Sequence, residues 1–318
     1  MRTKDFLATS LLAAAFLTGC TATEEPVMEN SGEAIRLTAG IGKTSRAVID
    51  AGHTSDLNIS FVRIDNPSTG SVWNAPAIDA VRTGGAGNTA ITFSTAQNYL
   101  KEDGESALIG YYPRKALEAG ISNPVTVKYT ITGDEDIMAT EIQTGKLTDP
   151  FGAFTFQHLL TQLQFRCTGS AEAIPQWTAV SSLTVTNIAT GLTLSLDKTG
   201  GATLTATGAS GQSLAVKNCP STVSATETEN PAIGYLMLYP VAGMGTSSSA
   251  IALEVKANYN GALKTQTVTI NNIDGGVRAG QSHLITLTFS EDGTITAEAG
   301  IAAWQPGNGG GQVITPGV

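Results

Sequence analysis

The residue best placed to do chemistry is Cys20, whose thiol follows Leu17-Thr18-Gly19 at the end of a short apolar run. Two basic residues precede that run, which is shorter than the roughly 20 residues a helix needs to span a bilayer. This arrangement is typical of a bacterial lipoprotein signal, in which residues 1–19 are removed and the new N-terminal thiol takes up a diacylglyceryl group. We therefore expect cleavage between Gly19 and Cys20 and a lipid on Cys20. The alternative is an ordinary secretory signal with a chance cysteine.

Two thiols remain after that removal, Cys167 and Cys219. An even number of cysteines in an exported chain permits a disulfide bond, so a Cys167–Cys219 bond is one candidate. Cys167 also alternates in phase with Leu163 and Phe165, which is the pattern of a small apolar residue buried beneath a strand. The sequence leaves both alternatives open.

No other group of residues has the spacing of a catalytic, metal or cofactor site. A glycine-rich stretch at residues 83–88 lacks both the following helix and the Lys-Ser/Thr pair of a phosphate loop. Acidic turns at residues 102–105 and 134–136 do not continue into the ligand spacing of a calcium loop. The three histidines lie far apart, and we expect structural roles for them: His53, His158 and His283. We expect no enzyme, no metal and no cofactor.

Composition restricts both the fold and the partners. Charged residues make up only 14% of the 318-residue chain, and almost no long segment shows the 3.6-residue period of a helix. Thr, Ser, Gly, Ala and Val are abundant instead, so we expect an all-β protein. The net charge of −9 becomes −10 once residues 1–19 are removed, which argues against nucleic acid as a partner.

The order of the strand-like runs predicts two tandem antiparallel β-sandwich domains, of the transthyretin-like kind. Residues 20–33 are acidic, have little to bury and are expected to form a flexible tether. Strand-like runs separated by turn residues then follow at the spacing of a sandwich. They are expected to restart after Pro150, which divides the chain into domains at 34–150 and 151–318, the second ending in a terminal strand and a glycine-rich tail.

The first strand is the clearest single element. Ile35, Leu37, Ala39 and Ile41 alternate with polar or small residues, which predicts a strand with one face on a core. The polar segment from Gly42 to Arg46 is then expected to be an exposed loop. Alternation returns at residues 295–303, which is a candidate for a strand that could be given to another subunit.

Several segments, in this order behind the lipoprotein signal, resemble those of the fimbrillins, the subunits of type V pili. The matching segments cover nearly all of the chain that remains after signal removal: Thr44-Ser45-Arg46-Ala47, Tyr111-Tyr112-Pro113, Asp136-Ile137-Met138-Ala139-Thr140, residues 154–165, residues 280–287 and Ile301-Ala302-Ala303-Trp304.

The resemblance implies a mechanism. A fimbrillin is exported as a lipoprotein to the outer membrane and is cut by a trypsin-like protease after an arginine, here between Arg46 and Ala47. The first strand then leaves, and a strand of another pilus subunit fills the groove. Arg46 could instead be an ordinary loop residue, as we expect Lys43, Arg63 and Arg82 to be.

The resemblance implies an adhesive, surface-exposed pilus subunit in the fimbrium, whose partners are other subunits and a host surface ligand. A lipid-anchored glycan-binding protein is the alternative, because such proteins also use tandem sandwiches. Sugar platforms need exposed aromatic side chains, however, and the aromatic content is 6% with three widely spaced tryptophans. The position in the pilus (stalk, tip or anchor) is left open.

Overall fold

The computed structural model describes residues 32–42, 49–70, 72–118, 122–208, 210–225 and 234–301, which belong to one compact unit, Gly32–Val318. Strands form throughout, and the single helical element among the described residues is the 3-10 turn η1 (Lys101–Asp103). The all-β prediction is therefore confirmed. No helix in the described part of the chain is both long and apolar enough to cross a membrane.

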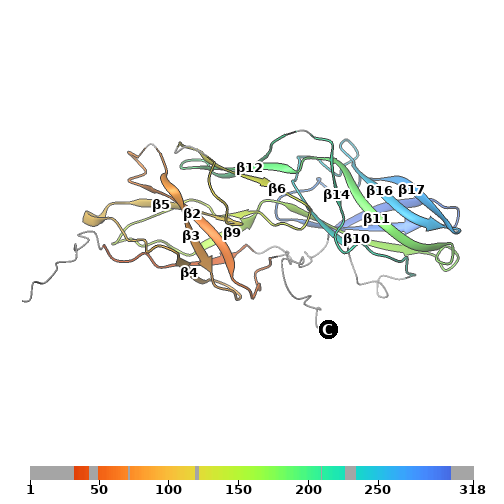
Figure 1. The fold of residues 1–318 in the computed structure, drawn as a ribbon, viewed down its shortest axis with the longest axis horizontal. Coiled ribbons are helices and arrows are strands. Elements are labelled where there is room, and N and C mark those ends of the chain that lie inside the picture. The colour runs from red at the N-terminus through yellow and green to blue at the C-terminus, as the bar shows by residue number, and fades with distance from the viewer. Residues whose placement is uncertain are drawn as a thin grey trace, which may run out of the picture. The chain divides into compact units, whose positions relative to one another are not determined.

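The largest sheet has eight strands in the order β2-β3-β4-β1-β9-β7-β5-β8 (Figure 1). Because β2 also pairs with β5, the ladder returns to its start and forms a closed ring, with β8 outside it. A strand inside such a ring has a hydrogen-bonded neighbour on each side. The bounds are β1 (Leu37–Ile41), β2 (Leu57–Asp65), β3 (Asn74–Arg82), β4 (Thr89–Phe93), β5 (Ser106–Tyr112), β7 (Met138–Ala139), β8 (Gln143–Gly145) and β9 (Phe154–His158).

Two four-stranded sheets hold most of the second half of the chain. One has the order β15-β10-β18-β19, with bounds Gly234–Leu238, Thr161–Gly169, Ser282–Phe289 and Ile295–Ile301. The other has the order β14-β11-β16-β17, with bounds Gln212–Ala215, Trp177–Ile188, Ile251–Tyr259 and Ala262–Ile270. Burial alternates along β16, as the period of two in its sequence requires for a strand with one face on the core.

A fourth, smaller sheet joins residues on either side of the expected domain boundary. It has the order β13-β12-β6, with bounds Gly201–Ala206, Gly191–Asp197 and Val125–Thr130 (Figure 1). In addition, the strand that follows Pro150 is β9, which pairs with β1 and β7 in the first sheet. The expected division at residue 150 therefore does not coincide with a change of sheet. Alternation in a sequence marks a strand but not its partner, so the sequence pattern does not show to which sheet β9 belongs.

Candidate functional site

The candidate site is the position of β1 in the first sheet. β1 forms where the alternation of Ile35, Leu37, Ala39 and Ile41 predicts a strand, so that prediction is confirmed. β1 runs antiparallel to β4 on one side and parallel to β9 on the other. Hydrogen bonds continue beyond both ends of β1, where Ile35 N donates to Gln97 O at 2.7 Å and Gly42 N donates to Phe156 O at 2.8 Å. The β4 edge is thus paired along Leu37–Ala39 and the β9 edge along Ala39–Ile41, so that Ala39 has a register partner on both sides.

The inner face of this segment is apolar and buried. It consists of Ile35, Leu37, Ala39 and Ile41, each at most 5% exposed. In the parallel ladder with β9, Ala39 is the register partner of Phe154, so the two side chains lie on the same face. Phe154 is fully buried and packs edge to face on Phe61, with ring centroids 5.3 Å apart. The small size of Ala39 leaves room for this aromatic cluster.

Arg82 in β3 fastens β1 to the neighbouring turn. Its side chain is fully buried, and its Nε donates to the carbonyl of Ala39 at 2.9 Å. The two terminal nitrogens donate to the carbonyls of Thr83, Gly85 and Gly87 at 3.2, 3.0 and 2.9 Å. All four acceptors are backbone carbonyls, and burial lowers the pKa of Arg82 because it disfavours the charged form.

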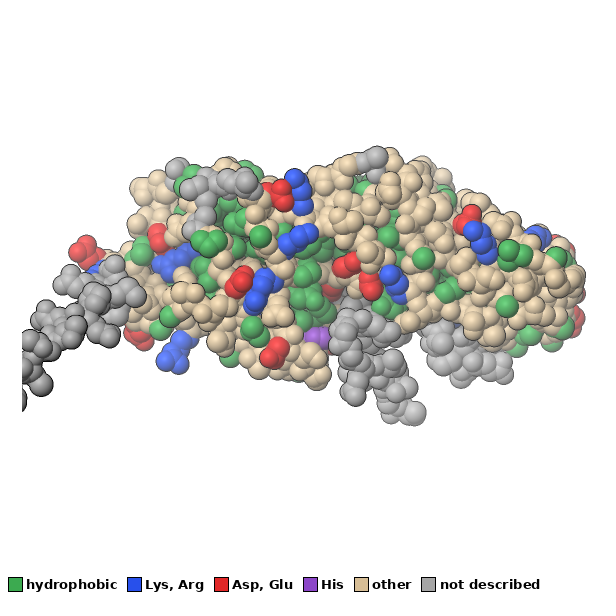
Figure 2. Space-filling model, viewed as in Figure 1, with side chains coloured by type: hydrophobic (Ala, Val, Ile, Leu, Met, Phe, Trp, Pro, Cys, Tyr) green, Lys and Arg blue, Asp and Glu red, His purple; other side chains and the backbone are tan. Residues whose placement is uncertain are grey.

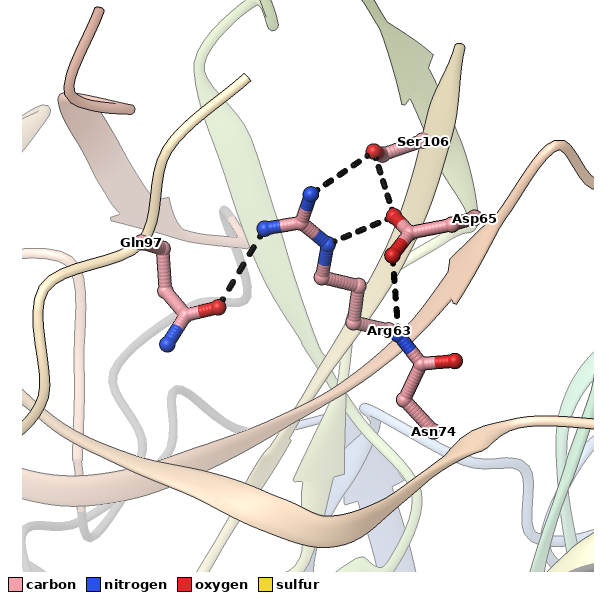
Figure 3. A network of polar contacts seen from close by, with 5 residues as sticks. All are labelled: Arg63, Asp65, Asn74, Gln97 and Ser106. Atoms are coloured by element: carbon pink, nitrogen blue, oxygen red, sulfur yellow. Dashed lines mark hydrogen bonds and ion pairs between the residues drawn. The ribbon is translucent and has the colours of Figure 1, made fainter. Parts of the chain in front are cut away.

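A second buried arginine, Arg63 in β2, contacts the side chain of Gln97, the residue whose backbone receives Ile35 ahead of β1; Figure 3 shows the contacts of Arg63. Its Nε pairs with Asp65 at 2.7 Å, and its terminal nitrogens donate to Ser106 at 3.1 Å and Gln97 at 3.3 Å. The carbonyl of Gln97 accepts the Ile35 bond described above. Arg63 and Arg82 were expected in loops, and this was wrong: both lie in strands, where backbone carbonyls and polar side chains satisfy their charge.

Asp65 completes this network, which is drawn in Figure 3. Burial alone would raise the pKa of Asp65, but the hydrogen bonds from Ser106, Arg63 and Asn74 outweigh it and lower the pKa below its usual value. The carboxylate is therefore the form that the fold stabilises.

The predicted processing residues lie outside the described residues. These are Gly19 and Cys20 in the signal and Arg46 and Ala47 in the segment 43–48. The described chain resumes at Ile49, which is buried. Gly85 N and Gly87 N donate to the carbonyls of His53 and Ala51, so residues 49–56 dock on the turn that Arg82 holds.

The motif segments that carry the resemblance meet at the junction between sheets. The buried His158, at the end of β9, contacts Asp136 with 2.7 Å between Nδ1 and Oδ2. Three residues later the chain enters β10, where Thr161 donates through its hydroxyl to the carbonyl of Gln281 at 2.9 Å. Gln164 donates to Ser282 across the parallel pair β10–β18. Side chains of the motif segments therefore tie β9 and β10 to the segments that lead into β7 and β18, and β10 to β18 itself.

Both cysteines are free thiols in the structure. Cys167 lies fully buried in β10, which corresponds to the apolar alternative rather than to the disulfide. Burial, together with the nearby Cys219, raises the pKa of the Cys167 thiol, so it stays protonated.

The two tryptophans among the described residues are buried rather than available to stack on a sugar. Trp73 and Trp177 are at most 2% exposed, and their indole nitrogens donate to the carbonyls of Leu196 and Ser290 at 3.0 and 2.9 Å. No group of three or more metal-ligating side chains occurs in this part of the chain. On the face seen in Figure 2, basic and acidic side chains are interspersed.

Comparison with known proteins gives one family match and several similar solved structures. The model of the fimbrillin-like family matches residues 45–304. Fimbrillin-like proteins are structural and adhesive rather than catalytic, which agrees with the expected lack of enzyme activity. No curated protein sequence matches the chain.

Solved structures with a similar fold come from species of Bacteroides and Parabacteroides. A "putative cell adhesion protein" of Bacteroides uniformis has 17% identity and a TM-score of 0.58, with 86% of this chain and 98% of that chain covered. A protein of the same description from Bacteroides ovatus has 20% identity and a TM-score of 0.54, with the same coverage of 86% and 98%. A third, from Parabacteroides distasonis, has 11% identity and a TM-score of 0.51, again covering 86% and 98%. At these identities the similarity shows the fold.

Proposed function

Because the chain belongs to the fimbrillin-like family, we propose that it is a bacterial pilus subunit that joins other subunits by strand exchange, in which β1 leaves and a foreign strand takes its place. The partners are other pilus subunits, either copies of this chain or related ones. The location is the cell surface and then the fimbrium, and the role is structural and adhesive.

The observation that carries this proposal is the position of β1 inside a closed ring. Loss of β1 would leave one edge of β4 and one edge of β9 without backbone partners. Such edges are templates for an added strand. The three larger apolar side chains that would leave contribute on the order of 5 kcal/mol, at about 1.5–3 kcal/mol for each buried side chain. A foreign strand could recover most of that.

The proposed trigger is cleavage after Arg46. The described chain on either side of residues 43–48 is held separately, because β1 precedes the segment and Ile49 and its neighbours dock elsewhere. A cut between Arg46 and Ala47 would therefore release β1 from the chain without loosening the residues that follow. β1 would then stay only through non-covalent contacts.

An arginine-specific protease tests this step, because it spares Lys43. Brief digestion of the full chain should cut after Arg46, and the cut protein should melt at a lower temperature and lose the segment before Ala47 under mild denaturant. The variant Arg46→Ala should keep the segment. Arg278→Ala, which removes the same charge from an exposed position, is the matched control and should behave as the wild type. Cutting elsewhere, or an unchanged melt after a complete cut, would contradict the proposal.

The second part of the proposal is lipid anchoring in the outer membrane before processing. It depends on the sequence Leu17-Thr18-Gly19-Cys20 and on the chemistry of the Cys20 thiol. Wild-type protein should fractionate with membranes and incorporate labelled palmitate, and Cys20→Ala should do neither. Membrane association of Cys20→Ala at the wild-type level would refute it.

We also propose that the strands form two sandwiches of the transthyretin-like kind, which meet at Leu159 and Leu160 rather than at residue 150. In support, the first strand of each half pairs in parallel with a late strand of the same half, β1 with β9 and β10 with β18. The β12–β13 hairpin then reaches back to pair with β6. An experimental structure would decide the arrangement.

A further inference from the structure

The side chains of β1 show which residue sizes fit its position between β4 and β9. Its inward side chains read large, large, small, large: Ile35, Leu37, Ala39 and Ile41. The small residue is the one next to Phe154, whose ring is fixed against Phe61, so a longer side chain there would have to displace a packed aromatic cluster. By contrast, a small residue in place of Leu37 would leave a cavity beside Ile91, its register partner in β4.

The outward side of the same strand is far more tolerant. Arg36 and Thr38 are exposed, so their side chains meet solvent. A Cβ built on Gly40 would come within 2.6 Å of the Asn88 Oδ1, but Asn88 is an exposed side chain that can turn away. Selection by size therefore acts through the inward positions and, on the outward side, at Gly40, which is itself buried and where an added side chain would have to displace Asn88.

Arg82 supplies a second contact, which needs a backbone carbonyl but no particular residue type. Its Nε needs a backbone carbonyl at the place of Ala39 O, and every peptide strand carries such carbonyls. A strand that slips by one residue would turn its apolar face outward, and one that slips by two would bring a large side chain against Phe154. The carbonyl bonded by Arg82 is thus that of the small residue.

We propose that the vacated β1 position selects a strand of another subunit with the inward pattern large, large, small, large, held in the register of β1, and that it disfavours β19 of a second copy. This rests on the proposed strand exchange. β19 offers Ile295, Ala297, Ala299 and Ile301, which places alanine where Leu37 fills the core. β19 is also an edge strand already paired with β18, so its release would break that ladder.

The test uses the full chain with a site for a sequence-specific protease inserted between Gly42 and Ile49, so that it does not depend on Arg46. After cleavage, synthetic peptides compete for the β1 position, and native mass spectrometry identifies by mass which peptide is bound. The peptide of residues 33–42 should replace the cleaved segment. If this peptide fails to replace it, strand exchange itself fails for this chain.

Peptide variants then test the pattern. Leu37→Ala should bind at least about thirtyfold more weakly, the lower end of the effect of a Leu-to-Ala cavity. Ala39→Leu should bind about 5- to 140-fold more weakly because of overpacking. The matched control Thr38→Ala, on the outward face, should bind within about threefold of the parent. Equal binding of Ala39→Leu and the parent peptide would overturn the inferred pattern.

A peptide of residues 294–303 tests the partner. It should bind at least about thirtyfold more weakly than residues 33–42, because it lacks the large residue at the position of Leu37. Binding as tight as that of residues 33–42 would overturn the inference and make a second copy of this chain the fitting partner. Register is tested separately with a Thr38→Cys peptide, which should form a disulfide with Ala90→Cys protein and not with Thr92→Cys protein.

Discussion

Replacement of Arg82 by methionine tests whether this buried cation holds β1 in the ring. Met has a similar length and no donor, so the four backbone carbonyls that Arg82 now bonds would lose their partner. Thr83 and Gly87 are exposed and Gly85 is half-buried, so the turn carbonyls can find water. Ala39 is fully buried, so its carbonyl would lose its side-chain donor without replacement.

The expected loss in the free energy of unfolding is about 3 kcal/mol. A hydrogen bond to a charged donor contributes about 1.5–3 kcal/mol, and a buried acceptor left unsatisfied costs about 1–3 kcal/mol. Relief of the desolvation of the guanidinium offsets part of this sum. At about 2–4 °C for each kcal/mol in a chain of this size, the melting temperature should fall by about 6–12 °C.

Differential scanning calorimetry measures that fall, and amide hydrogen exchange shows where the fold is loosened. The amides of Leu37–Ile41 should exchange much faster in Arg82→Met, whereas those of Ile251–Tyr259 in β16 should change little. Arg36→Met removes the same charge from an exposed position of the same segment and should melt within about 1 °C of the wild type. A melt of Arg82→Met that matches the melt of Arg36→Met, with unchanged exchange in β1, would refute the assigned role.

Two further substitutions test contacts away from β1. Asp65→Asn should lower the free energy of unfolding at pH 7 by about 1–3 kcal/mol, because the charged hydrogen bonds are lost. The pKa of Asp65 is lower in the folded state than in the unfolded state. The stability advantage of the wild type over Asp65→Asn should therefore be complete above the unfolded pKa, near 3.9, and should disappear as the pH falls through the folded pKa. A stability difference that persists in acid denaturation curves at the lowest pH would contradict this. Trp73→Phe removes the hydrogen bond to the Leu196 carbonyl and part of the packing of the indole ring. The free energy of unfolding, measured in urea, should fall by about 2–4 kcal/mol. A fall below about 0.5 kcal/mol would show that this contact does not hold the β12–β13 hairpin.

The strand β1 could be predicted because its signal is local. Alternation from Ile35 to Ile41 requires only that one face be buried, and the structure buries that face. The closure of the ring is different, because the partners of β1 lie at residues 89–93 and 154–158 and no local pattern specifies them. The expected division at residue 150 shows the same limit: β9 is a normal strand by sequence, and only its pairing assigns it to the sheet that contains β1.

Arg82 shows a second limit of reasoning from sequence. A basic residue before Thr83-Gly84-Gly85 resembles any charged residue entering a loop, and nothing in its type indicates full burial. The available signal was the glycine-rich turn itself, because glycines allow close approach of backbone, as at Gly84, where an added Cβ would lie 2.0 Å from the Thr54 carbonyl oxygen. Such a turn presents carbonyls that a buried guanidinium can bond.

The same arginine explains how one strand could leave without unfolding the rest. Arg82 bonds β1 through a single carbonyl, that of Ala39, and bonds the following turn through three. The same turn also donates backbone hydrogen bonds to residues 49–56, the first described segment after the proposed cut. When β1 departs, Arg82 therefore keeps most of its partners and the turn keeps its shape, so the groove would be preorganised for an incoming strand. Preorganisation of this kind lowers the entropy cost of binding, which makes a rigid acceptor more effective than one that must refold around its partner.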